Sequence, residues 1–241
     1  MVINNITMTS STDGEGLRTV IWFQGCSHGC KGCHNKHTWD ISKGTTIKPQ
    51  AVVNQIQNWK SKNKLSGLHL TLSGGEPFDQ AADAFNIAKQ LNPTSLWIFT
   101  GYTLEQLLQK RDSNITALLE KATILVDGRY EEDIPPSQVF AGSGNQRIID
   151  LQRFAELPSP AATNFAVELQ RLVVTNKYNL PEGYVHSSKT RTSDTCPKCS
   201  RICSDDLPFE RIRRITGYLV GTLDRFNVGK RAEEADRIKH A

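Results

Sequence analysis

The apolar residues between positions 18 and 126 follow two rhythms that alternate along the chain. Short runs rich in β-branched and aromatic residues predict buried strands; these runs are 18–24, 68–72, 95–100 and 123–126. Between them, apolar residues recur at helical spacing, which predicts amphipathic helices; these cover 49–62, 79–91, 104–110 and 115–121. Strands that alternate with helices predict a parallel sheet with right-handed crossovers. We therefore expect an α/β fold, a partial (β/α) barrel whose open side faces a large substrate.

The composition changes after Asp150. Residues 157–163 combine prolines with small residues, which is typical of the start of a linker. Residues 164–186 are apolar enough to be partly ordered, but they carry no motif that assigns a structure. We therefore expect a first domain, a connector and a small carboxyl-terminal tail, over residues 1–155, 156–194 and 195–241.

Charge and cysteine usage narrow the class of protein. No apolar run approaches the length of a membrane span, and the polar first ten residues lack the features of a signal peptide, so we expect a cytoplasmic location. The formal charge of +4 is small for 241 residues, and we expect neither nucleic acid nor a membrane as partner. The six cysteines fall into two clusters, which favours metal ligation in a reducing compartment over disulfides.

The first cluster consists of Cys26, Cys30 and Cys33, which directly follow the first predicted strand. Their spacing, C-x3-C-x2-C, places three thiols in one loop, one fewer than a closed zinc or iron–sulfur site uses. A [4Fe-4S] cluster held in this way has a fourth iron without a protein ligand, where a small chelating molecule can bind. The spacing alone is also compatible with a zinc half-site or with three buried cysteines.

A second motif, Gly74-Gly75-Glu76-Pro77, follows the predicted strand 68–72. Glycines let the backbone approach a ligand closely, and the glutamate offers an anionic acceptor where α/β folds keep their sites. An ammonium group would suit this acceptor. The motif by itself is more often a turn than a site.

Together the two motifs resemble those of the radical S-adenosylmethionine (SAM) enzymes, in which the methionine amino and carboxylate groups of SAM bind the open iron. Further stretches resemble the activating proteins of the anaerobic ribonucleotide reductase over residues 1–152; they are 13–18, 20–25, 32–35, 38–39, 125–128 and 142–150. The resemblance implies a [4Fe-4S] cluster on Cys26, Cys30 and Cys33, and SAM as cosubstrate. The implied SAM contacts are Gly32, Cys33, His34, Gly74, Gly75 and Glu76.

Two positions in this resemblance leave a choice. Asp127, just past the last predicted strand, is a candidate polar contact for SAM, and a role as a turn-former is an equal alternative. Gly32 stands where many radical SAM enzymes carry an aromatic residue. This implies that something other than a ring from the cysteine loop covers the adenine.

The second cysteine cluster lies in the tail and consists of Cys196, Cys199 and Cys203. The tail resembles the carboxyl end of the anaerobic ribonucleotide reductase itself, which has a four-cysteine zinc site just before its glycyl radical. On this resemblance Gly217 is the radical position, although the same glycine could simply form a turn. A tetrahedral zinc site would need a fourth ligand such as His186.

The resemblance implies a radical SAM activase that generates a glycyl radical on the anaerobic ribonucleotide reductase, or on its own Gly217. The implied partners are the large reductase subunit and a flavodoxin-like or other low-potential electron donor. Two alternatives stay open. One is activation of another glycyl-radical enzyme, such as a formate-lyase type; the other is a spare glycyl-radical-bearing subunit that complements a truncated reductase.

Overall fold

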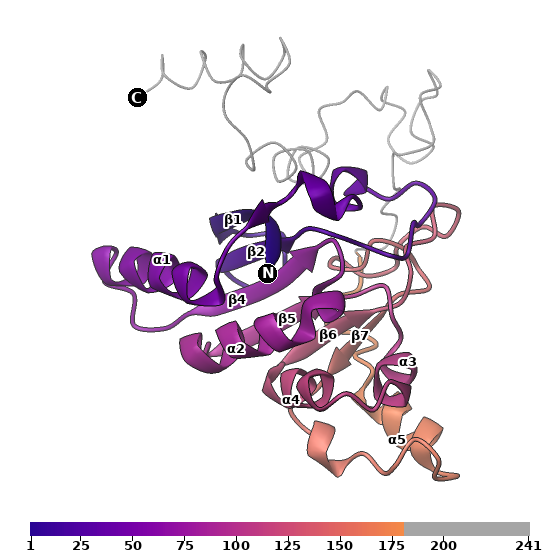
Figure 1. The fold of residues 1–241 in the computed structure, drawn as a ribbon. Coiled ribbons are helices and arrows are strands. Elements are labelled where there is room, and N and C mark those ends of the chain that lie inside the picture. The colour runs from indigo at the N-terminus through magenta and orange to yellow at the C-terminus, as the bar shows by residue number, and fades with distance from the viewer. Residues whose placement is uncertain (181–241) are drawn as a thin grey trace, which may run out of the picture. The chain divides into compact units, whose positions relative to one another are not determined.

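A seven-stranded mixed sheet organises residues 1–180, the part of the chain that the computed structural model describes (Figure 1). The strands are β1 (Val2–Ser10), β2 (Arg18–Phe23), β3 (Thr45–Thr46), β4 (His69–Gly74), β5 (Ser95–Phe99), β6 (Ile124–Asp127) and β7 (Arg147–Asp150). Their order across the sheet is β3-β1-β2-β4-β5-β6-β7. The described residues lie within one compact unit, Met1–Tyr184.

The centre of the sheet is parallel, as the sequence predicts. β2, β4, β5 and β6 pair in parallel, and all four were expected from their apolar runs. The outer strands β1, β3 and β7 pair antiparallel with their neighbours. The expected partial barrel is not shown; the described residues form a mixed α/β sheet that is parallel only in its middle.

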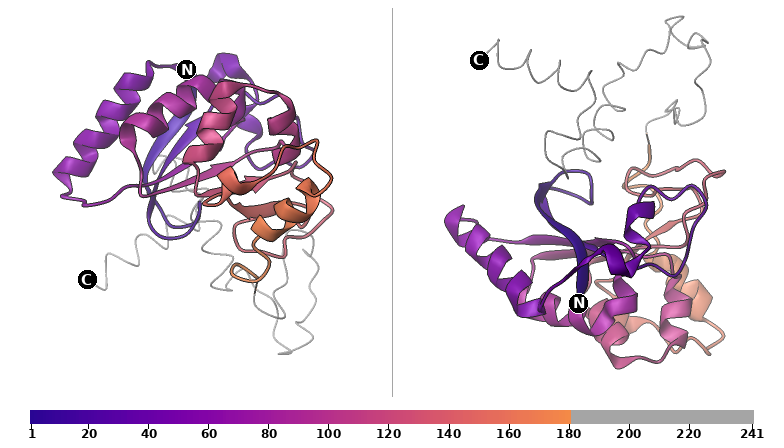
Figure 2. Two further views of the ribbon diagram at one scale, coloured as in Figure 1. Left: turned by 90° about the horizontal axis from the view of Figure 1, so that it is seen from below. Right: turned by 45° about the horizontal axis from the view of Figure 1, so that its top comes forward.

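Helices cover one face of this sheet (Figure 1, Figure 2). They are α1 (Pro49–Lys62), α2 (Ala81–Leu91), α3 (Leu104–Gln109), α4 (Ser113–Lys121) and α5 (Phe165–Leu172). Their apolar sides pack against strand residues such as Phe23, Leu72 and Ile98, which are fully buried. The four helices from α1 to α4 match the helical spacing in the sequence. Burial of this shared apolar face is what fixes the strands relative to one another.

A smaller, partly aromatic cluster contains strand residues that alternate along the chain with those of the main core, and therefore lies on the other face of the sheet. Trp97 of β5 contacts Phe140 and Tyr178 edge to face, with ring centroids 5.1 and 5.6 Å apart. Tyr178 is 7% exposed, and Val139 donates its backbone N–H to the Tyr178 carbonyl at 2.7 Å. On the helix side, Phe165 and Leu169 of α5 join the main core. Residues in the first part of the expected connector therefore pack into the first unit.

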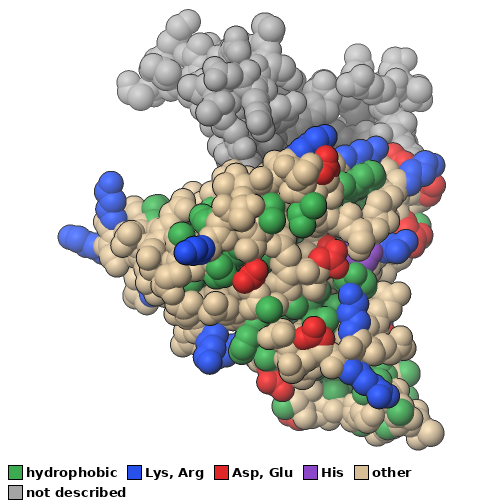
Figure 3. Space-filling view, viewed as in Figure 1, with side chains coloured by type: hydrophobic (Ala, Val, Ile, Leu, Met, Phe, Trp, Pro, Cys, Tyr) green, Lys and Arg blue, Asp and Glu red, His purple; other side chains and the backbone are tan. Residues whose placement is uncertain are grey.

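The described residues present charges of both signs at the surface. Figure 3 shows Lys and Arg side chains interspersed with Asp and Glu on the face that it presents. Within residues 1–180, none of the helices has the length and apolarity that crossing a membrane requires.

Candidate functional site

The carboxyl ends of the parallel strands bring the predicted site segments to one edge of the sheet. β2 leads into the cysteine loop (residues 25–34), and β4 ends in the glycine turn (residues 74–76). Phe23, the last residue of β2, lies opposite Gly74, the last residue of β4, so the loop and the turn start side by side. Asp127 ends β6 at the same edge. The structure thus brings together the two motifs that are separated by some forty residues in the sequence.

The three cysteines of the loop are half-buried and free. The backbone fixes the start of the loop, because Cys26 donates its N–H to the carbonyl of Trp39 at 3.2 Å. A turn joins the other two, since Cys33 donates its N–H to the carbonyl of Cys30 at 3.1 Å. Burial raises the pKa of the Cys26 thiol to about 11, while the backbone amides of His28 and Gly29 lower it by hydrogen bonding to the sulfur.

The arrangement of these thiols distinguishes between kinds of metal site. Within the described residues, no three His, Cys, Asp or Glu side chains converge where a single metal ion could bind them all. A zinc ion needs its ligands within about 2.3 Å of one point. A [4Fe-4S] cluster instead offers a separate iron to each cysteine, so its thiols need not converge on one point. Three free thiols on one half-buried loop are the donor set that the sequence predicts for a [4Fe-4S] cluster.

The glycines of the glycine turn let it lie against the backbone of β2 and the cysteine loop. Gly75 donates its N–H to the carbonyl of Phe23, and Glu76 donates its N–H to the carbonyl of Gly25, both at 2.8 Å. A Cβ on Gly75 would collide with the Gly25 carbonyl oxygen. Gly74 has a φ of +100°, in the region that favours glycine, and a Cβ there would lie 2.7 Å from the Phe23 backbone. The close approach that these glycines permit is thus to the protein's own backbone.

The carboxylate of Glu76 is fully buried, and each of its oxygens accepts from two donors. Oε1 accepts from the Phe78 amide at 3.0 Å and from the Thr100 hydroxyl at 2.9 Å. Oε2 accepts from the Gly101 amide and lies within hydrogen-bond distance of His28 Nε2, both at 2.9 Å. A carboxylate offers about four lone-pair sites, so these partners fill it. An ammonium group could reach this carboxylate only after one of the four had left.

His28 is the site residue that the sequence analysis missed. It lies between the first two cysteines, and its side chain is 4% exposed. Its ring packs edge to face against Tyr102, with centroids 4.4 Å apart, and a Cβ on Gly101 would overlap it. A histidine inside a cysteine motif is a visible signal. Its pairing with Glu76, which is 48 positions away, could not be predicted from the sequence.

The other half of the cysteine loop contacts the connection between β6 and β7. Gly32 has a φ of +74°, and a Cβ there would lie 2.6 Å from the Glu132 side chain. The rings of His34 and Tyr130 lie with their centroids 4.8 Å apart. The space beside Gly32 is therefore taken by a side chain from residues 128–146.

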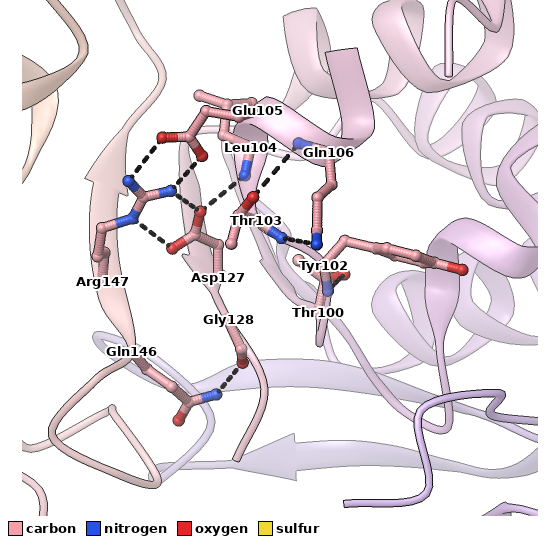
Figure 4. A network of polar contacts seen from close by, with 10 residues as sticks. All are labelled: Thr100, Tyr102, Thr103, Leu104, Glu105, Gln106, Asp127, Gly128, Gln146 and Arg147. Carbon is pink, nitrogen blue, oxygen red and sulfur yellow. Dashed lines mark hydrogen bonds and ion pairs between the residues drawn. The ribbon is translucent and has the colours of Figure 1, made fainter. Parts of the chain in front are cut away.

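Asp127 lies in a polar network that ties the end of β6 to α3 and β7 (Figure 4). Its buried carboxylate accepts from the Leu104 amide at 2.8 Å and from Arg147 Nε at 2.9 Å and Nη2 at 2.5 Å. Arg147 also donates to both oxygens of Glu105. These hydrogen bonds raise the pKa of Arg147 and lower that of Glu105. Asp127 thus connects secondary-structure elements in this structure.

The predicted tail residues, Cys196, Cys199, Cys203 and Gly217, and the suggested zinc ligand His186 lie outside the described residues.

Comparisons with known proteins divide the chain near residue 150. A family model described as a 4Fe-4S single cluster domain matches residues 12–149, and a model described as anaerobic ribonucleoside-triphosphate reductase matches residues 151–240. Relatives named anaerobic ribonucleoside-triphosphate reductase-activating protein match a little more than half of this chain. The Haemophilus influenzae protein is 32% identical over 150 residues, which cover 58% of this chain and 92% of that protein. The Enterobacteria phage T4 protein is 30% identical over 142 residues, 56% of this chain and 85% of that protein.

The junction between the two matches does not coincide with the boundary of the folded unit. The first match ends one residue before the end of β7, and the second begins at Leu151. The compact unit includes α5 and the other described residues after β7. About thirty residues of the part that matches the reductase model are therefore built into the same unit as the cysteine loop.

Proposed function

Because this chain belongs to the family of anaerobic ribonucleoside-triphosphate reductase-activating proteins and contains a 4Fe-4S single cluster domain, we propose that it is a radical SAM activase. The observation that carries the proposal is the contact between the cysteine loop and the glycine turn. The loop that carries three free thiols and the glycine turn are joined through their backbones at the carboxyl ends of the parallel strands, where α/β folds bind cofactors. The thiols suit a cluster with one open iron.

In this proposal Cys26, Cys30 and Cys33 hold the cluster. When bound and reduced, a [4Fe-4S] cluster with an open iron supplies the electron that splits SAM into methionine and a 5′-deoxyadenosyl radical. That radical then takes the hydrogen atom from a glycine Cα, which leaves 5′-deoxyadenosine and a glycyl radical. The protein positions the reactants and excludes water and oxygen.

The proposed SAM contacts are Gly32, Cys33, His34 and the backbone of Gly74 and Gly75. The carboxylates of Glu76 and Asp127 serve the site by ordering its walls, since protein donors already occupy them. The target is a glycine of the large anaerobic reductase subunit. A flavodoxin-like or other low-potential protein supplies the electron.

A second candidate target is this chain's own Gly217. The observation in its favour is the match of residues 151–240 to the reductase family model. Gly217 follows Leu180, the last described residue, by 37 positions (217 minus 180). At about 3.3–3.6 Å per extended residue, this length of chain sets an upper limit of roughly 120–130 Å, so length does not prevent activation within one polypeptide.

Oxygen cleavage separates the two targets, because a glycyl radical is cut by oxygen at its own position. The reconstituted protein is incubated anaerobically with SAM and a reductant and then exposed to air. The masses of the chain and of any fragments are measured by mass spectrometry. If the wild-type chain loses the peptide that begins near Gly217, and the Gly217→Ala and Cys30→Ala variants do not lose it, the result supports activation of the chain's own tail. An intact chain in every sample, together with cleavage of an added reductase, assigns the activity to a separate subunit.

A further inference from the structure

Residues 173–180, which we call the strap, begin at the outer edge of β7, the last strand of the sheet. Val173 forms an antiparallel bridge with Ile149, and Val174 donates its N–H to the carbonyl of Ile148 at 2.7 Å. Val173 packs against the main core, whereas Val174 packs against the smaller cluster on the opposite face of the sheet. The strap thus begins in the way that many peptides bind proteins, by pairing with the free edge of a sheet.

A second set of hydrogen bonds joins the strap to the connection between β6 and β7. Gln138 donates its side-chain amide to the carbonyl of Val174 at 2.7 Å, and Leu180 donates its N–H to the carbonyl of Ser137 at 2.9 Å. Gln138 and Asn179 form an antiparallel bridge. The strap is therefore held at both ends through its backbone, by contacts that do not depend on most of its side chains.

Tyr178 is the one strap residue that is buried. Its ring lies edge to face against Trp97 and Phe140, and its hydroxyl donates to the Glu15 carboxylate at 2.8 Å. Lys177 donates to the same carboxylate at 2.7 Å, in an exposed contact. Buried tyrosines whose hydroxyl has a partner are among the residues that contribute most to binding at protein interfaces. The strap therefore combines backbone pairing with one aromatic anchor.

The two sides of this contact belong to parts of the chain that match different families. Every strap residue lies within 151–240, which matches the model described as anaerobic ribonucleoside-triphosphate reductase. The residues that receive the strap lie within 12–149, which matches the model described as a 4Fe-4S single cluster domain; they include Glu15, Trp97, Ser137, Gln138, Phe140 and Ile148. The contact thus joins a segment that resembles a reductase to a surface of the cluster domain.

We propose that this surface is a docking site for an extended segment of a separate anaerobic ribonucleotide reductase, and that the strap fills it within the same chain. The segment that fits pairs with β7 through its backbone and presents a lysine and a tyrosine to Glu15 and Trp97. Tethering gives the strap an effective concentration on the order of mM, so a separate segment has to displace it. The inference rests on the proposed function for the identity of the partner.

A labelled peptide with the sequence of residues 172–181 is the first probe. Its binding to the full-length protein is measured by fluorescence anisotropy, without cluster or SAM, and an unlabelled complete reductase is then added as competitor. Tyr178→Ala removes the anchor of the strap and should bind the peptide about tenfold or more tightly than wild type does, the effect of a buried aromatic anchor. The reductase should displace the peptide. A peptide that itself carries Tyr178→Ala should bind neither protein.

Leu118→Ala is the matched control, because it removes a fully buried side chain from the main core and leaves the strap contacts intact. It should lower stability but bind the peptide as weakly as wild type does. The double variant Lys177→Met, Tyr178→Phe serves if Tyr178→Ala does not fold. It keeps the ring and removes both hydrogen bonds to Glu15, so it should bind the peptide more tightly than wild type, by a smaller factor.

The proposal is overturned if Tyr178→Ala binds the peptide no better than Leu118→Ala does, or if the Tyr178→Ala peptide binds as well as the native one. Either result would make the strap ordinary packing within one folded unit. Peptide binding that the reductase does not compete with would overturn the assigned partner. Because no cluster or SAM is present, a protein that failed to cleave SAM would contradict the proposed function and leave this binding result valid.

Discussion

Gly75 lies so close to Gly25 that a Cβ on Gly75 would overlap the Gly25 carbonyl oxygen. The contact joins the glycine turn after β4 to the first residue of the cysteine loop after β2. The glycine turn therefore supports the loop directly, as well as being a candidate contact for a ligand.

Substitution of Gly75 by alanine should disturb this contact. We expect a loss of about 1–3 kcal/mol in the free energy of unfolding, the usual cost of overpacking, because the obstructing atom belongs to the backbone and cannot rotate away. Denaturant unfolding of the metal-free protein measures it. Gly67→Ala is the control: its Cβ would meet only the Thr94 hydroxyl, at 3.1 Å, and a side chain can move. Equal stability of the two variants would contradict the close packing.

Removal of Arg147 should leave the buried Asp127 carboxylate without its cationic partner. Breaking a fully buried ion pair costs about 3–5 kcal/mol. Arg147 is 29% exposed, so we expect a smaller loss, about 2–3 kcal/mol for Arg147→Gln. Glu105→Gln, at the more exposed end of the same network, should cost no more than about 1 kcal/mol. An Arg147→Gln variant as stable as Glu105→Gln would contradict the assigned role of Asp127.

Glu105 also gives this network a pH dependence. The hydrogen bond from Arg147 lowers the pKa of Glu105 below its ordinary 4.5. A depressed carboxyl pKa contributes stability that is present above the unfolded value and is lost as the pH falls through the folded value. The stability difference between wild type and Glu105→Gln should therefore be largest near pH 7 and shrink below pH 4.5. Unfolding curves at several pH values test it; a gap that widens with acid would contradict the assigned cause.

Tyr178 tests whether the first residues of the reductase-like part belong to the folded unit. Its ring is buried against Trp97 and Phe140. Tyr178→Ala should therefore cost about 3–4 kcal/mol, near the range for large aromatic residues in a core. The neighbouring Lys177→Met removes an exposed ion pair with Glu15 and an exposed ammonium group 5.1 Å from the centre of the Tyr178 ring, and should change stability by less than about 1 kcal/mol. Equal effects of the two substitutions would place residue 178 outside the core.

The parallel centre of the fold could be predicted because its strands are buried on both faces. Runs such as β6, in which all four residues are buried, therefore read as continuous apolar segments. The outer strands gave no such signal. In β1 only Ile3 and Ser10 are buried, and its pairing with β2 has two register irregularities. Because buried and exposed residues do not alternate regularly in β1, its sequence did not predict a strand.

For α5 a usable signal existed. Phe165, Leu169 and Leu172 recur at helical spacing and are all buried. The sequence analysis expected residues 164–186 to be partly ordered but assigned no element to them, and the structure forms α5 from Phe165–Leu172.

At the candidate site, spacing in the sequence singled out the cysteines and the glycine turn, which the structure places side by side, but it did not indicate their contacts. Glu76 was predicted as an acceptor for a ligand, and its carboxylate is filled by protein donors. His28 and Asp127 have partners 48 and 20–23 positions away. Which donor meets which acceptor depends on the strand register and the loop paths, and local patterns do not contain this information.

Reductive cleavage of SAM tests the central claim most directly. The full-length protein is reconstituted anaerobically, mixed with SAM and a strong reductant, and assayed for methionine and 5′-deoxyadenosine. Wild type and Cys196→Ala should form both products in equal amounts, while Cys26→Ala, Cys30→Ala and Cys33→Ala should form neither. Cleavage that persisted in Cys30→Ala, or a wild-type protein that carried about four irons yet left SAM intact, would contradict the account.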